Sequence, residues 1–276
     1  MNLKQALAQA RRVLEDNGIE DSGLEGEILL RHVLKMPRAE FFSSLDKPLA
    51  AGEKEKLSNL IELRCAGEPS AYIIGYREFF GLDFKTDRRV LIPRPETELI
   101  VEKALDYSRR FGYRKIADIG TGSGCIAVSL ALNIPEAVLY AVDTSLPALE
   151  VAEENSIKHN VKQHIHFLWG NLLEPLPGPV DLIVANLPYV KTGEITSVFE
   201  PRRALDGGSD GLDKIKELIG QLEGKLDSRG ALLLEVGQGQ DESVKDNLHN
   251  LYPLAAIDVT RDLAGIGRVV SIRLTS

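Results

Sequence analysis

The sequence contains little cysteine and no long apolar run. Two cysteines, Cys65 and Cys125, occur in 276 residues, far apart and in segments of helical pattern. We expect them to be reduced packing residues of a cytoplasmic protein. No apolar stretch approaches the roughly 20 residues that span a membrane, and the first residues lack the apolar core of a signal peptide. We therefore expect neither membrane insertion nor export.

Positively charged residues are outnumbered by negatively charged ones, and clusters of metal ligands are scarce. The formal net charge is −8 at pH 7, which disfavours a surface that holds a long polyanion, although a local basic groove stays compatible with it. His164 and His166 stand close together, but no cluster of Cys or Asp accompanies them. We therefore predict that the protein has no metal site.

The first 75 residues have the apolar spacing of short helices. From Leu3 to Leu14 an apolar residue returns every three or four positions, and residues 21–36 and 52–64 repeat this pattern. Short helices of this kind can bury their apolar sides only against one another. Residues 1–75 are therefore predicted to form a small helical domain.

The pattern changes after that domain. Aromatic and apolar residues concentrate in residues 77–85, a polar turn follows at residues 87–89, and residues 90–92 are apolar again. Such a sequence predicts a β-hairpin. We expect this hairpin, over residues 76–93, to link two domains.

From residue 94 to residue 276, apolar runs of strand length alternate with helical patterns. This alternation predicts a mainly parallel sheet with helices on both faces. Only a short glycine-bearing connection separates the last two of the seven runs, so the final strand is predicted to be antiparallel. The predicted fold class is α/β: a Rossmann-like domain with a seven-stranded sheet behind the helical domain.

A glycine-rich loop follows the first strand of this second domain. It consists of Gly120, Thr121, Gly122, Ser123 and Gly124. Glycine permits a tight turn and a close approach of a ligand to the backbone. The spacing fits neither the dinucleotide fingerprint nor the phosphate-binding loop. We therefore predict a nucleoside ligand that needs no pyrophosphate.

Polar residues also end the next two predicted strands. Asp143 ends the second strand, where a carboxylate can accept hydrogen bonds from ribose hydroxyls. Asn171 follows the third strand and can meet an adenine edge; Leu172 beside it is assigned to the same site. Together with the glycine loop, these residues predict a site for a nucleoside cofactor.

The fourth strand, residues 182–185, stops abruptly at a polar residue. Asn186, Leu187, Pro188 and Tyr189 follow it. In open α/β sheets, ligands bind at the carboxyl ends of the strands. We therefore predict that the chemistry occurs at this tetrapeptide.

The tetrapeptide suits methyl transfer to an amide or aromatic amino nitrogen, whose delocalised lone pair makes it a poor nucleophile. Two fixed acceptors that hold both N–H bonds would position the nitrogen and stabilise positive charge as it develops. The Asn186 side-chain oxygen is predicted to be one acceptor. The Leu187 carbonyl, fixed by Pro188, is predicted to be the other. Tyr189 would cover the planar group.

These motifs resemble those of the HemK/PrmC family, protein-glutamine methyltransferases that modify peptide-chain release factors. The resemblance covers nearly the whole chain and includes residues 75–81, 91–98 and 200–211. It implies a seven-stranded methyltransferase fold with S-adenosyl-L-methionine as the cofactor. The residues then expected to bind the cofactor are Gly120, Thr121, Gly122, Ser123, Gly124, Asp143, Asn171, Leu172 and Asn186.

The resemblance further implies that the substrate is the glutamine in the Gly-Gly-Gln motif of class I release factors. Asn186, Pro188 and Tyr189 would then be catalytic, and these three with Leu187 would bind the substrate. Residues 1–75 and the hairpin would hold the release factor. This helical domain has ten Lys or Arg against twelve Asp or Glu, which leaves −2 and suits a protein partner better than RNA. We expect a monomer that does not bind nucleic acid.

One residue departs from the family signature. The signature is Asn-Pro-Pro-Tyr, and Leu187 replaces its first proline. Because Asn-Leu-Pro-Tyr also resembles ribosomal RNA adenine dimethylases, the alternative function is methylation of an adenine amino group in RNA or DNA. A third hypothesis is a cofactor-binding interaction module without turnover, which the intact Asn186, Pro188 and Tyr189 disfavour.

Overall fold

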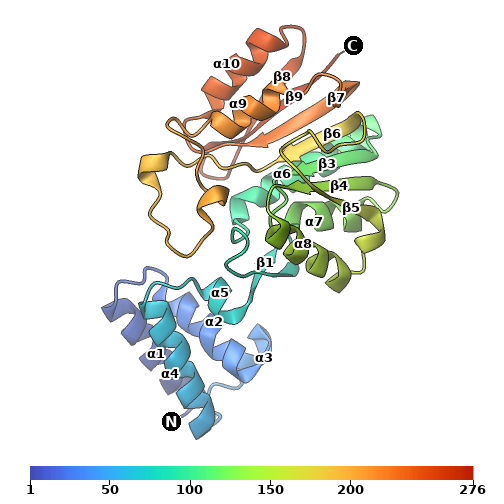
Figure 1. The fold of residues 1–276 in the computed structure, drawn as a ribbon. Coiled ribbons are helices and arrows are strands. Elements are labelled where there is room, and N and C mark those ends of the chain that lie inside the picture. Colours follow the sequence, from blue (N-terminus) through green and yellow to red (C-terminus); the bar gives the residue numbers. More distant parts are fainter. Residues whose placement is uncertain (276) are drawn as a thin grey trace. The chain divides into compact units, whose positions relative to one another are not determined.

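The computed structural model describes residues 1–275, which fold as two compact units that divide after Tyr76. The first unit is helical (Figure 1). Its helices are α1 (Leu3–Asp16), α2 (Ser22–Leu34), α3 (Arg38–Ser43), α4 (Ala51–Cys65) and α5 (Ser70–Ile74).

Local hydrogen bonds and one apolar core explain the helical unit. The Asn2 side chain accepts from the Gln5 N–H at 2.9 Å, and the Gln5 side chain accepts from the Asn2 N–H at 3.0 Å. This capping box starts α1. Leu14, Leu29 and Phe41 have no exposed surface in the shared core, so the prediction of a helical N-terminal region is confirmed.

A two-stranded hairpin follows, with β1 (Tyr76–Phe79) and β2 (Leu82–Lys85). Phe80 and Gly81 form its turn, with φ values of 52° and 73°, as a two-residue hairpin of this kind requires. The polar turn predicted at residues 87–89 is present, since the Val90 N–H donates to the Asp87 carbonyl at 3.1 Å. It does not join the two strands of the hairpin, so that part of the prediction was wrong. The strands pair within residues 76–85 because Gly81 allows the tighter turn there.

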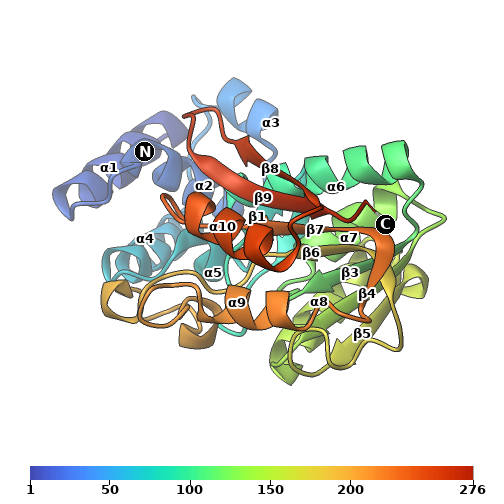
Figure 2. The ribbon, with the colours of Figure 1, turned by 90° about the horizontal axis from the view of Figure 1, so that it is seen from above.

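A seven-stranded sheet forms the centre of the second unit, in the order β5-β4-β3-β6-β7-β9-β8. Figure 2 shows β5 and β8 at opposite edges. β9 is antiparallel to β7 and β8, and the pairs from β5 to β7 are parallel. The predicted α/β fold is confirmed. The strands are β3 (Lys115–Ile119), β4 (Val138–Asp143), β5 (Ile165–Trp169), β6 (Val180–Ala185), β7 (Leu226–Glu235), β8 (Ala256–Arg261) and β9 (Gly267–Arg273).

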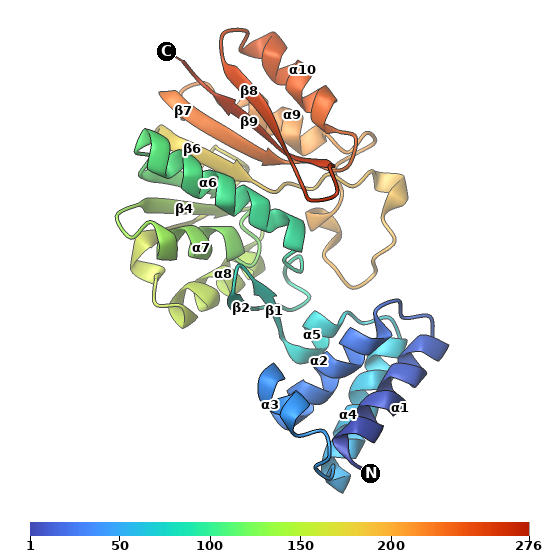
Figure 3. The same cartoon turned by 180° about the vertical axis from the view of Figure 1, so that it is seen from behind.

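Helices cover both faces of the sheet (Figure 3). One face carries α6 (Glu98–Phe111), α7 (Cys125–Asn133) and α8 (Leu146–Lys158), and the other carries α9 (Asp213–Gly220) and α10 (Asp241–Leu251). Neighbouring strand residues face opposite layers, as Ile116 and Ala117 do. α9 ends at Gly220, and Gly224 takes a left-handed turn with φ 71° before β7.

Short 3-10 helices lie in the connections: η1 (Pro95–Thr97), η2 (Lys162–His164), η3 (Thr192–Glu194) and η4 (Arg202–Ala204). Within residues 1–275, none of the helices is long and apolar enough to cross a membrane.

The sheet register brings three strand ends together. Ile119 of β3 aligns with Val142 of β4 on one side and with Ala185 of β6 on the other. The connections reverse direction at β3, and such a switch point opens a crevice at the carboxyl edge. The residues that follow these strands therefore meet there.

Candidate active site

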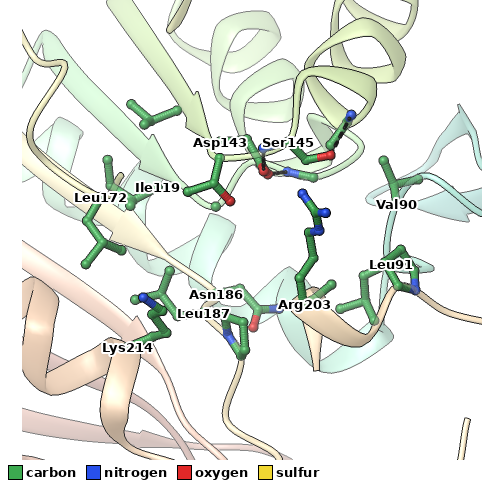
Figure 4. Close-up of a pocket in the computed structure, with 18 of the residues that line it drawn as sticks. Val90, Leu91, Ile119, Asp143, Ser145, Leu172, Asn186, Leu187, Arg203 and Lys214 are labelled. Carbon is green, nitrogen blue, oxygen red and sulfur yellow. Dashed lines mark hydrogen bonds between the residues drawn. The ribbon is translucent and has the colours of Figure 1, made fainter. Parts of the chain in front are cut away.

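A pocket opens at this carboxyl edge, entirely within the second unit (Figure 4). Its wall includes many of the residues that the sequence predicts for the cofactor and the substrate. These are Gly120, Gly122, Asp143, Asn171, Leu172, Asn186, Leu187 and Pro188. Four other predicted residues do not line the pocket and instead contact the segments around it: Thr121, Ser123, Gly124 and Tyr189.

The glycine loop is fixed by its backbone. The N–H groups of Gly120 and Thr121 both donate to the Val142 carbonyl at 2.9 Å. Gly124 has φ 78°, and a Cβ atom there would stand 2.9 Å from the Cβ of Ala152 in α8. Only glycine fits this position, because a side chain would push α7 and α8 apart. Ser123 accepts from the Asn155 side chain at 2.8 Å through its carbonyl.

A buried carboxylate holds the loop from beneath. The Thr121 hydroxyl donates to Asp118 Oδ2 at 2.7 Å, and the Ala127 N–H donates to the same oxygen at 3.1 Å. Asp118 is fully buried, and burial raises its pKa to about 7. The Thr121 side chain thus points into the protein and stabilises the turn.

Asp143 lies in the wall of the pocket, and backbone N–H groups fix both of its carboxylate oxygens. Its Oδ2 accepts from the Gly122 N–H at 3.0 Å, and its Oδ1 accepts from the Ser145 N–H at 2.8 Å. Each oxygen keeps further acceptor capacity. Burial raises the pKa of Asp143, while these backbone hydrogen bonds act in the opposite direction. A nucleoside with vicinal hydroxyls fits this wall of the pocket.

Asn171 is already engaged with the protein through its donor group. Its Nδ2 donates to Glu217 Oε1 at 2.6 Å and to Glu174 Oε1 at 3.3 Å. The side-chain oxygen is then the group left to accept from an adenine amino group. Leu172 is buried and takes a left-handed backbone conformation with φ 47°. Contact of these two residues with adenine stays a prediction.

Asn186 follows β6 and has a fixed amide. Its Nδ2 donates to the Thr97 hydroxyl at 3.0 Å, and Thr97 is 2% exposed. Thr97 ends η1, so this hydrogen bond joins residues 91–98 to the residue that follows β6. With the nitrogen bound to Thr97, the Asn186 Oδ1 remains as an acceptor.

Tyr189 is fixed by two hydrogen bonds to its carbonyl and hydroxyl groups and by glycines that pack closely against it. Its carbonyl accepts from Gln240 Nε2 at 3.0 Å, and its hydroxyl donates to Glu235 Oε1 at 3.3 Å. A Cβ atom at Gly207 would lie 2.6 Å from the Pro188 carbonyl oxygen and 2.8 Å from the Tyr189 Cα. The glycines of residues 206–211 therefore let this loop pack directly on the strand exit.

An ion pair joins two of the segments that the sequence motifs single out. Arg94 Nη2 lies 2.8 Å from both carboxylate oxygens of Glu200, and Glu200 Oε1 also accepts from the Ile92 N–H at 3.3 Å. Residues 91–98 and 200–211 are thereby tied together beside the pocket, where Pro201 is one of the lining residues.

Several residues of the site lie outside the motifs that the sequence offers. Arg203 and Lys214 bring positive charge to the pocket (Figure 4), and Thr97 and Glu235 contact the predicted tetrapeptide. A signal existed for Glu235, because it ends an apolar strand as Asp143 does. No such signal marks Arg203, whose placement depends on the path of a long loop.

Comparison with known proteins identifies the family. A release factor glutamine methyltransferase from Moorella thermoacetica is 40% identical over 274 residues, which are 97% of this chain and 97% of the relative. The chain belongs to the release factor glutamine methyltransferase family. Another member, from Bradyrhizobium diazoefficiens, is 38% identical over 98% of this chain and 95% of its own. The predicted membership is confirmed, and the chain is an S-adenosyl-L-methionine-dependent protein-glutamine methyltransferase.

Family models and solved structures agree with this membership. The PrmC N-terminal domain matches residues 5–75, and the Methyltransferase small domain matches residues 96–205. A methyltransferase from Pyrococcus furiosus superposes with a TM-score of 0.53 at 16% identity, covering 71% of this chain and 90% of its own. A ribosomal protein L11 methylase from Lactobacillus delbrueckii gives 0.50 at 22% identity, with 72% and 88% covered. These two structures share the fold of this methyltransferase.

Proposed function

We propose that the enzyme methylates the side-chain amide nitrogen of the glutamine in the Gly-Gly-Gln motif of class I peptide-chain release factors. This activity would support translation termination in the cytoplasm. The supporting observation is the Asn186 amide, whose nitrogen donates to Thr97 at 3.0 Å. Its oxygen is thereby left as an acceptor beside the glycine loop.

The cofactor supplies a methyl group on a positively charged sulfur. Gly120, Gly122 and Asp143 would hold its nucleoside part, and Arg203 and Lys214 give the pocket positive charge for its carboxylate. The glycine loop leaves the backbone open to the ligand, and Asp143 offers acceptors to the ribose hydroxyls. The residues present therefore fit this cofactor.

Asn186 and its neighbours would do the remaining work on the acceptor. The Asn186 Oδ1 accepts one N–H of the substrate amide and the Leu187 carbonyl accepts the other, so the nitrogen is held with its plane fixed. These acceptors would stabilise positive charge as the new N–C bond forms and the bond between the methyl carbon and the cofactor sulfur breaks, with a neutral thioether as the leaving group. The methylated nitrogen then releases one proton to water. Pro188 restricts the backbone of Leu187, and Tyr189 covers the amide plane.

We also propose that residues 1–75 bind the release factor, with the hairpin segment 76–93 as the link to the catalytic domain at 94–276. The match to the PrmC N-terminal domain over residues 5–75 supports this role. The near-neutral charge of that region suits a protein partner better than RNA. We propose that the enzyme acts as a monomer and does not need nucleic acid.

Side-by-side labelling tests the substrate. The enzyme is incubated with methyl-labelled cofactor and with either a class I release factor or ribosomal RNA. We expect label on the release factor and none on RNA. A release factor in which the motif glutamine is replaced by asparagine is the matched control, and it should stay unlabelled. Label on adenine, with the steep salt dependence of a polyanion complex, would instead support the alternative.

A further inference from the structure

A glutamine after β7 connects three segments around the predicted tetrapeptide. Gln240 Nε2 donates to the Tyr189 carbonyl at 3.0 Å, and a longer contact of 3.5 Å reaches the Gly211 carbonyl. Its Oε1 accepts from the Gly237 N–H at 2.8 Å. The exit from β6, the loop at residues 206–211 and the turn between β7 and α10 therefore meet at one side-chain amide.

The partners of Gln240 allow only one orientation of its amide. The Gly237 N–H can only donate, and the Tyr189 and Gly211 carbonyls can only accept. An amide satisfies both sides at once, because its oxygen accepts and its nitrogen donates. A carboxylate of the same size has no donor, and an apolar side chain of the same length has neither group. The contacts therefore fit an amide in particular, and not just a side chain that fills the space.

The space around Gln240 leaves little freedom to Tyr189. A Cβ atom at Gly237 would lie 2.9 Å from Gln240 Oε1 and 3.1 Å from Tyr189 Cδ2. The Tyr189 hydroxyl donates to Glu235 Oε1 at 3.3 Å. Both the hydroxyl and the carbonyl of Tyr189 are thus bound by side chains of residues 235–240.

Backbone hydrogen bonds hold the residue that follows the tetrapeptide. The Val190 N–H donates to the Leu205 carbonyl at 3.0 Å, and the Gly207 N–H donates to the Val190 carbonyl at 2.8 Å. These bonds begin one residue after the Tyr189 carbonyl that Gln240 binds. The position of the strand exit therefore depends on this side chain together with the backbone of residues 205–207.

We propose that Gln240 is a positioning residue for methyl transfer, which fixes the Tyr189 backbone and so places the aromatic ring over the plane of the substrate amide. Gln240 does not line the pocket and acts through Tyr189. This inference rests on the proposed function, which assigns the covering role to Tyr189. Cofactor binding should not depend on Gln240, because none of its hydrogen bonds reaches the glycine-rich loop or Asp143.

Gln240→Met tests the proposal against the control Gln238→Met on the same turn. Methionine keeps the length of the side chain and removes both hydrogen-bonding groups. We expect kcat/KM for a release factor to fall about tenfold, since a partly buried carbonyl loses its donor, while calorimetry shows unchanged cofactor affinity. Gln238 is exposed, so its replacement should leave kcat/KM unchanged. Wild-type kcat/KM in Gln240→Met would overturn the proposal.

Gln240→Glu tests whether the site requires the donor. An ionised carboxylate can still accept from the Gly237 N–H, but it places an acceptor against the Tyr189 carbonyl. A protonated carboxyl group can donate to that carbonyl. The ratio of the variant's kcat/KM to that of the wild type should therefore be low at pH 8 and should rise as the pH falls to 6. A ratio that does not change with pH would overturn the role of the donor.

This ratio removes the titration of the neighbouring groups. Burial raises the pKa of Glu235 to about 7. Asp241 begins α10, and Arg268, paired with Asp262 at 2.8 Å, binds the backbone of Val236 through its carbonyl. These groups are the same in the variant and in the wild type, so a pH-dependent ratio belongs to position 240.

A double-mutant cycle tests whether Gln240 acts through Tyr189. If Gln240 only positions the ring, Gln240→Met should cause little further loss of kcat/KM once Tyr189→Ala has removed that ring. Losses that multiply in the double variant would show that Gln240 acts elsewhere, and they would overturn the proposal.

Native-state hydrogen exchange tests the proposal without turnover. In Gln240→Met the Val190 and Gly207 N–H groups should exchange about tenfold faster, while the Ile183 and Val184 N–H groups in β6 keep their wild-type rates. Unchanged exchange at Val190 and Gly207 would overturn the proposal even in an active enzyme. Faster exchange in β6 as well would show a purely structural role and would also overturn it.

The exchange measurement also separates this inference from the proposed function. A wild type that transfers no methyl group to a release factor would contradict the proposed function. The exchange rates of Val190 and Gly207 would then still show whether Gln240 fixes the strand exit.

Discussion

The Leu187 side chain packs directly on Gly120. A Cβ atom at Gly120 would lie 3.2 Å from Leu187 Cδ2, and Leu187 is only 4% exposed. Leu187, the residue that departs from the family signature, thus fills the space between the glycine-rich loop and the end of β6. The sequence predicted a role only for the backbone carbonyl of Leu187, whereas in the structure its side chain also contributes packing.

Leu187→Ala should destabilise the protein by about 2–5 kcal/mol, the usual effect of removing a buried leucine side chain. The cavity would lie beside Gly120, so cofactor affinity should fall as well. Chemical denaturation and calorimetry measure the two effects. Leu187→Pro, which restores the family signature, is the informative partner variant and should keep its turnover. Wild-type stability of Leu187→Ala would contradict the packing role.

Asn186→Ala should lower turnover by about tenfold or more, because one preorganised acceptor is lost from the transition state. The cofactor should still bind, since its loop and Asp143 are unchanged. Single-turnover assays measure the first effect and calorimetry the second. Loss of cofactor binding in this variant would show that Asn186 acts mainly in the cofactor site.

Asp143→Ala should act on the side of the pocket opposite Asn186. We expect it mainly to weaken cofactor binding, because Asp143 supplies the acceptors for ribose and also holds the Gly122 N–H at 3.0 Å. Asp143→Asn separates these roles, since an amide oxygen can still accept from Gly122. Cofactor affinity from calorimetry is the measurement. An unchanged affinity in Asp143→Ala would remove this residue from the ribose site.

Asp118→Asn should change how stability depends on pH. Burial raises the pKa of Asp118 from 3.8 to about 7, so between these values the folded state holds a proton that the unfolded state has lost. Its contribution to stability is thus lost as the pH rises through this window. The melting temperature of Asp118→Asn, relative to that of the wild type, should therefore be higher at pH 8 than at pH 4. An equal difference at both pH values would contradict the shifted pKa.

The sequence predicts the fold well because periodicity reports burial directly. Alternating strand and helix patterns give the seven-stranded sheet, and the short connection before β9 (Gly267–Arg273) gives its antiparallel strand. Turn positions are harder to predict. The hairpin turns at Gly81 because glycine adopts a left-handed conformation easily, while the polar residues 87–89 look equally suited to a turn.

The site is predicted wherever a polar residue ends an apolar strand, as Asp143 and Asn186 do. It is missed where the partner comes from a distant segment. Thr97 reads as part of a helix start, and only the fold brings it to Asn186, 89 residues later in the chain. Arg203 lies in a loop without periodicity, so its place in the pocket has no signal in the sequence.

The central claim is that the enzyme methylates a glutamine amide in a protein. Mass spectrometry of a release factor treated with enzyme and S-adenosyl-L-methionine tests this claim most directly. We expect one added methyl group on the side-chain nitrogen of the Gly-Gly-Gln glutamine, and none when Asn186→Ala replaces the wild type under the same short incubation. An unmodified glutamine after complete incubation with the wild type, or a methyl group on another residue, would contradict it.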